Sequence, residues 1–245
     1  MNTRKAFFLL LMFLLSVTYT QGQQSIDRYK AIFTAPPQHV PTIKTPDAPL
    51  AGNGDIGITM GGTPDNLCFY IGKNDFWRAY PVYPGGIALP GGLDITIEGL
   101  RNASYYAEQL PESAEITALF STDDCKVSLS AWVAATDNKV IIELQSDKEQ
   151  VVRLRLWAAE GNTSVNAQGT EPVIWVSRSF EKSELLRWPT HVALAMNTTS
   201  ETLRLTPDKK ERLVITVYTN HDIPNWKEKA IIDCLLYTSP SPRDT

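Results

Sequence analysis

The sequence predicts an all-β fold of antiparallel strands, arranged as a sandwich or a barrel. About a dozen segments alternate apolar and polar side chains with a period of two, as in strands that bury one face. Turn-forming residues separate these segments at intervals of about 8 to 14 residues, which favours hairpins over helical crossovers. Helical periodicity is confined to a short stretch near the C-terminus, so parallel βαβ units are not expected.

The predicted elements follow one another in a simple order. Residues 23–49 are rich in proline and should form an extended segment that runs over a surface. Residues 55–62 and 66–72 flank a Thr-Pro-Asp turn, which predicts a hairpin. A short helix is predicted to begin at residues 224–226. The other strands are predicted over residues 93–100, 104–110, 114–122, 126–135, 139–146, 151–159, 172–178, 191–197, 202–206 and 212–219.

Residues 1–22 have the pattern of a secretory signal peptide. Arg4 and Lys5 precede an apolar run that ends in small residues near Gly22. The run is shorter than the roughly 20 residues that a membrane span needs, although an uncleaved anchor is the alternative. We therefore expect export to the periplasm or the exterior of a bacterium, with no membrane attachment after cleavage.

The C-terminal residues predict an artefact of DNA sequencing. Cys234–Asp244 reads CLLYTSPSPRD, and its back-translation in one frame resembles a transposase-based sequencing adapter. Residues 234–245 are therefore set aside as an adapter artefact, the alternative being a genuine tail rich in proline and serine. The rest divides into a β-sandwich domain over 50–223 and the start of a linker over 224–233, and we expect the native protein to continue past Asp233.

Composition and charge exclude several classes of protein. A 245-residue chain with 43% hydrophobic and 20% charged residues is ordinary for a globular protein. Its net charge of −4 gives no basic surface for nucleic acid. His39, His191 and His221 have no metal-ligand spacing, so neither a metal nor a cofactor is expected. Cys68 and Cys125 could form a disulfide or remain two buried thiols.

Three tryptophans lie within predicted strands. They alternate with other residues among apolar neighbours, so we expect core positions rather than platforms for sugar rings. These residues are Trp132, Trp157 and Trp175.

A glycine-rich stretch precedes the first predicted hairpin. Gly52, Gly54 and Gly57 match the spacing GxGxxG of dinucleotide-binding loops. Here a strand follows, so no helix N-terminus is available to hold a phosphate. The pattern instead predicts a tight turn into the sheet, in which Asn53 and Asp55 tolerate unusual backbone angles.

Residues 73–78, with the sequence KNDFWR, combine cations, an amide, a carboxylate and aromatic rings. Sugar sites need this mixture, because aromatic faces stack on pyranose rings while polar side chains bind hydroxyl groups. The alternative is a structural corner, with Trp77 in a core and Asp75 paired to Lys73 or Arg78.

The string PLAGNGDIG, followed by a hairpin and FYIGKNDFW, resembles the N-terminal β-domain of glycoside hydrolases with a six-hairpin (α/α)6 catalytic barrel. This group includes α-L-fucosidases that act on 1,2-linked fucose, and maltose or trehalose phosphorylases. The resemblance covers residues 48–78. Relative to the fucosidase pattern, Ala51 interrupts the Leu-Gly-Asn string and Asp55 replaces a basic residue.

The resemblance implies an antiparallel β-supersandwich, galactose mutarotase-like, with the short helical start of a linker to a lost catalytic barrel. Since the catalytic carboxylates of such enzymes lie in the barrel, no catalytic residue is assigned in this chain. The implied function is that of a non-catalytic domain of an exported glycoside hydrolase, which supports the barrel and lines the sugar pocket. The implied partners are an oligosaccharide or polysaccharide and the missing catalytic domain. The candidate sugar-binding residues are Asn74, Asp75, Trp77 and Arg78, and the turn residues are Gly52, Asn53, Gly54, Asp55 and Gly57.

Two other classes remain open. A stand-alone carbohydrate-binding β-sandwich would bind sugar without any further domain, and Trp77→Ala would weaken that binding. A structural or adhesion domain would show no dependence on sugar.

Overall fold

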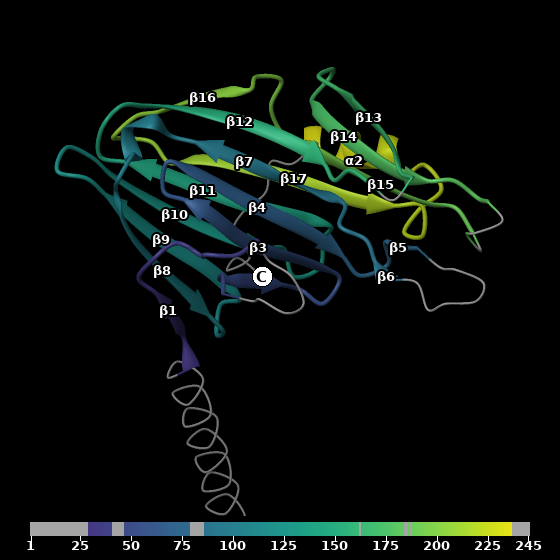
Figure 1. Cartoon of the computed structure of the whole chain (residues 1–245). Coiled ribbons are helices and arrows are strands. Elements are labelled where there is room, and N and C mark those ends of the chain that lie inside the picture. Colours follow the sequence, from purple (N-terminus) through teal and green to yellow (C-terminus); the bar gives the residue numbers. More distant parts are fainter. Residues whose placement is uncertain are drawn as a thin grey trace, which may run out of the picture.

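The computed structural model describes residues 29–40, 47–78, 86–161, 163–183, 186 and 188–236. Over these residues the chain forms two stacked antiparallel sheets (Figure 1), which confirms the predicted all-β sandwich. The larger sheet has the strand order β1 (Ala31–Phe33), β8 (Ser104–Leu110), β9 (Glu115–Ser121), β10 (Lys126–Val133), β11 (Lys139–Ser146), β17 (Glu211–Thr219), β15 (Thr190–Met196), β14 (Ile174–Phe180) and β13 (Val165–Gly169). The smaller sheet has the order β16 (Thr202–Leu205), β12 (Gln150–Ala158), β7 (Gly91–Thr96), β4 (Asn66–Lys73), β3 (Ile56–Thr63) and β2 (Leu50–Gly52).

The core lies between the two sheets and follows the alternation of the strands. In β10, Val127, Leu129 and Ala131 point into the core, while Ser128 and Ser130 lie on the outer face. Phenylalanines from both sheets contribute to the core: Phe69, Phe120 and Phe180 are all fully buried. A two-layer sandwich is expected to give each strand one buried face and one solvent-exposed face.

The first predicted hairpin is confirmed. Strands β3 and β4 pair in a register that runs from Ile56 opposite Lys73 to Thr63 opposite Asn66. The loop between them is therefore the two residues Pro64 and Asp65. This register also brings the residues just before β3 next to those just after β4.

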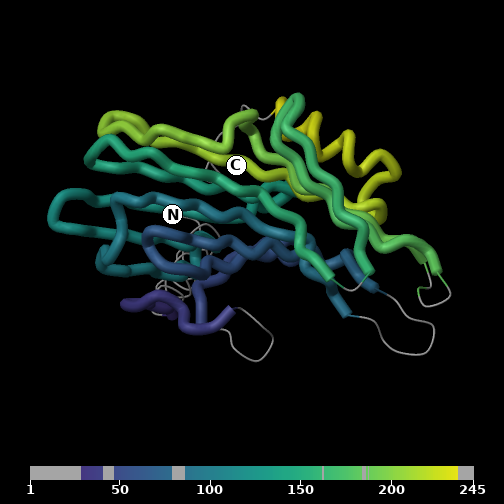
Figure 2. Tube along the Cα trace, turned by 45° about the horizontal axis from the view of Figure 1, so that its top comes forward, coloured from purple at the N-terminus to yellow at the C-terminus, as the bar shows by residue number. Residues whose placement is uncertain are grey.

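Helix α2 (Trp226–Leu235) packs on the outer face of the larger sheet against β15 and β17 (Figure 2). Thr216 Oγ1 donates to the Ala230 carbonyl at 2.6 Å, and Cys234 Sγ donates to the Ala195 carbonyl at 3.2 Å. The helix thus extends two residues into the segment that was set aside as an adapter artefact.

Several details differ from the sequence-based expectations. The extended segment contains β1, which adds an edge strand to β8. The predicted strand 93–100 ends at Thr96, and a 3-10 turn over Glu98–Leu100 then directs Leu100 into the core. Strands β2 and β13, and the small hairpin of β5 (Trp77–Arg78) and β6 (Gly86–Ile87), were not expected. The predicted signal peptide (1–22) and residues 237–245 lie outside the described part of the chain.

Cys68 and Cys125 are both free thiols, so the disulfide alternative is not found. Cys125 belongs to the core, and its Sγ lies 3.6 Å from Ser146 Oγ. Cys68 lies in β4, on the other sheet, where burial raises the pKa of its thiol to about 12. A thiol with so high a pKa stays protonated and is a poor nucleophile.

Candidate functional site

The glycine-rich turn before β3 is held by the side chain of Asn53. Its Oδ1 accepts hydrogen bonds from the backbone N–H groups of Asp55 at 2.9 Å and Ile56 at 2.8 Å. Its Nδ2 donates to the Ala134 carbonyl at 2.9 Å, which ties the turn to the end of β10. The positive φ of this turn belongs to Gly54 (92°). The expectation of unusual backbone angles at Asn53 and Asp55 is therefore wrong, because their side chains act in the turn and glycine takes the left-handed conformation.

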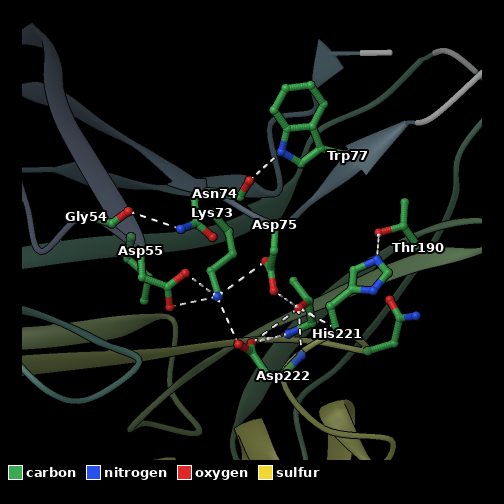
Figure 3. A network of polar contacts seen from close by, with 12 residues as sticks. Gly54, Asp55, Lys73, Asn74, Asp75, Trp77, Thr190, His221 and Asp222 are labelled. Carbon is green, nitrogen blue, oxygen red and sulfur yellow. Dashed lines mark hydrogen bonds and ion pairs between the residues drawn. The ribbon is translucent and has the colours of Figure 1, made fainter. Parts of the chain in front are cut away.

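The two motifs singled out in the sequence meet at this end of the sandwich (Figure 3). The backbone N–H of Asn74 donates to the Asp55 carbonyl at 2.8 Å, and Asn74 Nδ2 donates to the Gly54 carbonyl at 3.1 Å. The hairpin register explains this contact, since it aligns the start of β3 with the end of β4.

Lys73 lies at the centre of a cluster of three carboxylates. Its Nζ is 2.6 and 2.7 Å from the two carboxylate oxygens of Asp55, 3.0 Å from Asp222 and 3.3 Å from Asp75. The lysine side chain is only 1% exposed, whereas the carboxylates retain partial exposure. Burial lowers the pKa of Lys73, but the hydrogen bonds to Asp55 and Asp222 outweigh it and hold the pKa above its ordinary value. Lys73 is therefore a fixed cation that is not available to a ligand.

Asp75 is held on its second oxygen by Thr219, at the end of β17. Thr219 Oγ1 donates to Asp75 Oδ2 at 2.6 Å, and the Thr219 backbone N–H donates to Asp222 Oδ2 at 2.8 Å. Of the two alternatives for Asp75, the pairing with Lys73 is present in the structure. Asp75 thus connects the smaller sheet to the larger one.

Trp77 is 41% exposed. The alternative interpretation of residues 73–78 as a structural corner placed Trp77 in a core, and that part of it is wrong. Its indole N–H donates to the Asn74 carbonyl, which fixes the ring beside the turn (Figure 3). Asn74 is also exposed. An anchored aromatic ring next to an exposed amide can contact a ligand without first being ordered, which keeps the entropic cost of binding low.

Arg78 packs on the ring of Phe180, with its guanidinium carbon 5.5 Å from the ring centre. Arg178, which is buried, lies 4.9 Å from the same ring and donates to the Leu89 carbonyl at 2.6 Å. Burial and the charge of Arg78 together lower the pKa of Arg178. Two cations thus share one aromatic ring at this end of the molecule.

Asp222 and Thr219 complete the cluster, and sequence reasoning did not find them. Asp222 is 149 positions from Lys73 along the chain. Thr219 ends a predicted strand and Asp222 lies three residues beyond it, but no sequence feature pairs either residue with Lys73. Only the stacking of the two sheets brings these residues together.

A separate open groove of about 1000 Å³ lies beside the glycine-rich turn. Gly52 and Asn53 line it, together with Trp132, whose Nε1 has no hydrogen-bond partner. Glu143 contributes a buried carboxylate to the same groove, and sequence reasoning did not single it out.

Glu143 is held by two cations. Lys210 Nζ lies 2.9 Å from one of its oxygens, and Arg212 contacts the other through Nε at 2.9 Å and Nη2 at 2.6 Å. Burial raises the pKa of Glu143, but these hydrogen bonds and charges outweigh it and leave the pKa below its ordinary value. The groove floor therefore carries a carboxylate that stays ionised.

Glu143→Gln should make the protein less sensitive to acid. A carboxyl group with a lowered folded-state pKa stabilises the fold above its unfolded pKa of about 4.3, and this contribution is lost as the pH falls through the folded value. Urea unfolding should be measured from pH 7 to pH 3. At pH 7 the free energy of unfolding of the variant should be about 1 kcal/mol lower than that of the wild type. Below pH 4 the free energy of unfolding should fall further in both proteins, but by less in the variant. Glu149→Gln, which removes an exposed pair with Arg204, is the control and should change little. Equal acid sensitivity in the wild type and Glu143→Gln would contradict this account.

The described residues contain no group of three or more side chains suited to hold a metal ion. In the same part of the chain, no helix has the length and apolar character required to span a membrane.

Neither a known protein family nor a curated protein sequence matches this chain. Among solved structures, it is similar to a candidate kojibiose phosphorylase from the human microbiome, with a TM-score of 0.46 and 11% sequence identity. The superposition covers 89% of this chain and 36% of that chain, so the present sequence spans little more than a third of its length. The chain is an all-β sandwich domain with a polar, aromatic-flanked cluster at one end.

Proposed function

We propose that this chain is the N-terminal, non-catalytic β-domain of an exported glycoside hydrolase, and that the end of the sandwich around Trp77 lines the sugar pocket. The observation that carries the proposal is the exposed indole of Trp77, which is anchored to Asn74. The motif over residues 48–78 supports it, because both halves of that motif meet in this cluster.

The cluster would act as a rigid base for sugar recognition. The ion pairs of Lys73 fix the turn that carries Asn74 and Trp77. The Trp77 ring would stack on the C–H face of a pyranose ring, and the Asn74 amide would bind hydroxyl groups. Asp75 and Arg78 would line the same subsite, with one Asp75 oxygen already bound to Thr219.

We further propose that residues 234–245 derive from a sequencing adapter and that the native frame continues into a helical catalytic barrel. Long-read sequencing of the source DNA across codon 233, from a library without that adapter, tests this. A frame that continues for several hundred residues with helical hairpins and acidic motifs supports the proposal. A genomic CLLYTSPSPRD followed by an early stop codon overturns it.

Trp77→Ala tests the sugar-binding role in the complete enzyme recovered in this way. We expect KM for the oligosaccharide substrate to rise about tenfold with little change in kcat, because stacking contributes binding in both ground and transition states. Trp188→Ala is a matched control, since Trp188 is also 41% exposed. An unchanged KM in Trp77→Ala would contradict the role of Trp77 in the sugar pocket.

The isolated 245-residue chain distinguishes the other classes of protein. Measurable sugar affinity that Trp77→Ala weakens, without any downstream domain in the gene, would instead define a stand-alone carbohydrate-binding module.

N-terminal sequencing of the mature protein tests export, and a start near residue 23 supports it.

A further inference from the structure

The outer face of the smaller sheet carries an aromatic residue that was expected in the core. In β12, Val152, Leu154 and Leu156 point inward, so Trp157 lies on the outer face with Arg153 and Arg155. Trp157 is half-buried and does not belong to the core cluster. The core prediction for Trp157 was therefore wrong. Trp132 is buried, but it lies outside the main core cluster and lines the groove. Trp175 is half-buried and packs against the small cluster under α2.

The Trp157 indole lies across the neighbouring strand β7, over Gly92. A Cβ atom at Gly92 would be 2.2 Å from the Phe69 carbonyl oxygen, 2.5 Å from Cζ2 and 2.9 Å from Cε2 of the indole, so a side chain there would conflict with both the backbone and the ring. The indole N–H donates to Asp94 Oδ1 at 3.0 Å. Tyr70 stands edge-on to the ring, with the centres 5.9 Å apart and the planes at 80°. These contacts fix the ring in one orientation.

Asp94 is itself held in place by Arg155. The Arg155 Nε and Nη2 atoms donate to Asp94 Oδ2 at 2.9 and 2.6 Å. The Arg155 side chain is 73% exposed, so its guanidinium remains accessible. The Trp157 ring is thus bordered by a carboxylate, which accepts hydrogen bonds from hydroxyl groups, and a guanidinium, which donates to them.

A row of three glycines crosses strands β2, β3 and β4 beside these aromatic residues. Gly52, Gly57 and Gly72 lie next to one another in β2, β3 and β4, and all three share the outer face with Tyr70. A Cβ atom at Gly57 would meet nothing within 4 Å. Glycine inside a strand weakens a sheet and often marks a place where a ligand approaches the backbone. Successive residues on one face of a strand are about 6.6 Å apart, so the row borders the Tyr70 position directly.

We propose that this outer face is a second carbohydrate-binding site, which takes a linear chain of neutral pyranose units. One sugar ring stacks on Trp157, the chain continues past Tyr70 over the glycine row, and Asp94 and Arg155 bind hydroxyl groups. This site lies on β12, β7 and β4 and does not depend on Asn74, Trp77 or a downstream catalytic domain. It would hold the enzyme on a polysaccharide while another part of the molecule acts on it.

Calorimetric titration of the full chain with cellohexaose, xylohexaose, mannohexaose and maltohexaose tests the proposal. At least one of these probes should bind, and Trp157→Ala should weaken it about tenfold. Gly57→Gln should also weaken binding, because a Cβ atom at Gly57 meets nothing within 4 Å and the longer side chain would cover the glycine row. Val151→Gln is the control, on the same face of β12 but about 20 Å away.

A second measurement does not depend on the folding of a variant. Oxidation with N-bromosuccinimide, followed by mass spectrometry, should show Trp157 protected by the bound oligosaccharide while the exposed Trp188 remains reactive. Lack of binding by all four probes, or binding with no protection of Trp157, would overturn the proposal. Binding that Trp77→Ala removes and Trp157→Ala leaves intact would overturn this site and support the Trp77 site instead.

Discussion

Replacing Lys73 with methionine is expected to lower the free energy of unfolding by about 3 kcal/mol. The substitution shortens the side chain by one atom and removes the ammonium group that contacts Asp55, Asp75 and Asp222. The three carboxylates would then repel one another around a buried methyl group. They retain partial exposure to water, so the low end of the range for a broken buried ion pair is appropriate. For a domain of this size the melting temperature should fall by about 6 to 12 °C.

Lys148→Met provides the control, because Lys148 is exposed and its substitution should change stability by less than about 0.5 kcal/mol. The pH dependence gives a second readout. A lysine with a raised folded-state pKa stabilises the fold fully below its unfolded pKa of about 10.4, and that contribution is lost as the pH rises through the folded value. The stability difference between the wild type and Lys73→Met should therefore narrow only above about pH 10.4. Equal stability of the two proteins at pH 7 would show that the cluster does not hold the sheets together.

The strand pattern predicted the fold because each long strand buries one face. Alternation located β8 with both ends correct. The predicted Thr-Pro-Asp turn located the hairpin of β3 and β4, although Thr63 belongs to the strand and only Pro64 and Asp65 form the loop. Short strands escaped prediction, since β1 and β2 have three residues each and are too short to show a period. Strand β13 also escaped, because its side chains are nearly all exposed and give no apolar signal.

The candidate site was predictable in part. Residues 52–57 and 73–78 were both identified, and the hairpin register is sufficient to bring them together. The third carboxylate was not predictable, because the contact between Asp222 and Lys73 depends on how the two sheets stack. Trp157 shows a different kind of error. Its face could have been read from the alternation, since it shares a period of two with Arg153 and Arg155.

Gly91→Ala should destabilise the protein by about 3 kcal/mol or more, although it adds a single methyl group. Gly91 lies in β7, between β12 and β4. A Cβ atom there would be 2.0 Å from the Trp157 carbonyl oxygen and 3.0 Å from the Ala158 Cα, both backbone atoms. Relief of such a contact requires β12 to shift, and with it the pairing that carries Trp157. Chemical denaturation of the purified variant measures the loss.

Gly57→Ala is the matched substitution and should raise the free energy of unfolding instead of lowering it. Both glycines lie in strands and neither has a positive φ, so alanine suits the backbone at each position. A Cβ atom at Gly57 meets nothing within 4 Å, and the loss of unfolded-state freedom should stabilise the protein by about 0.4 to 1 kcal/mol. The two variants therefore separate backbone entropy from strand packing. Equal stability of Gly91→Ala and Gly57→Ala would contradict the close contact between the backbones of β7 and β12 at Gly91 and Trp157.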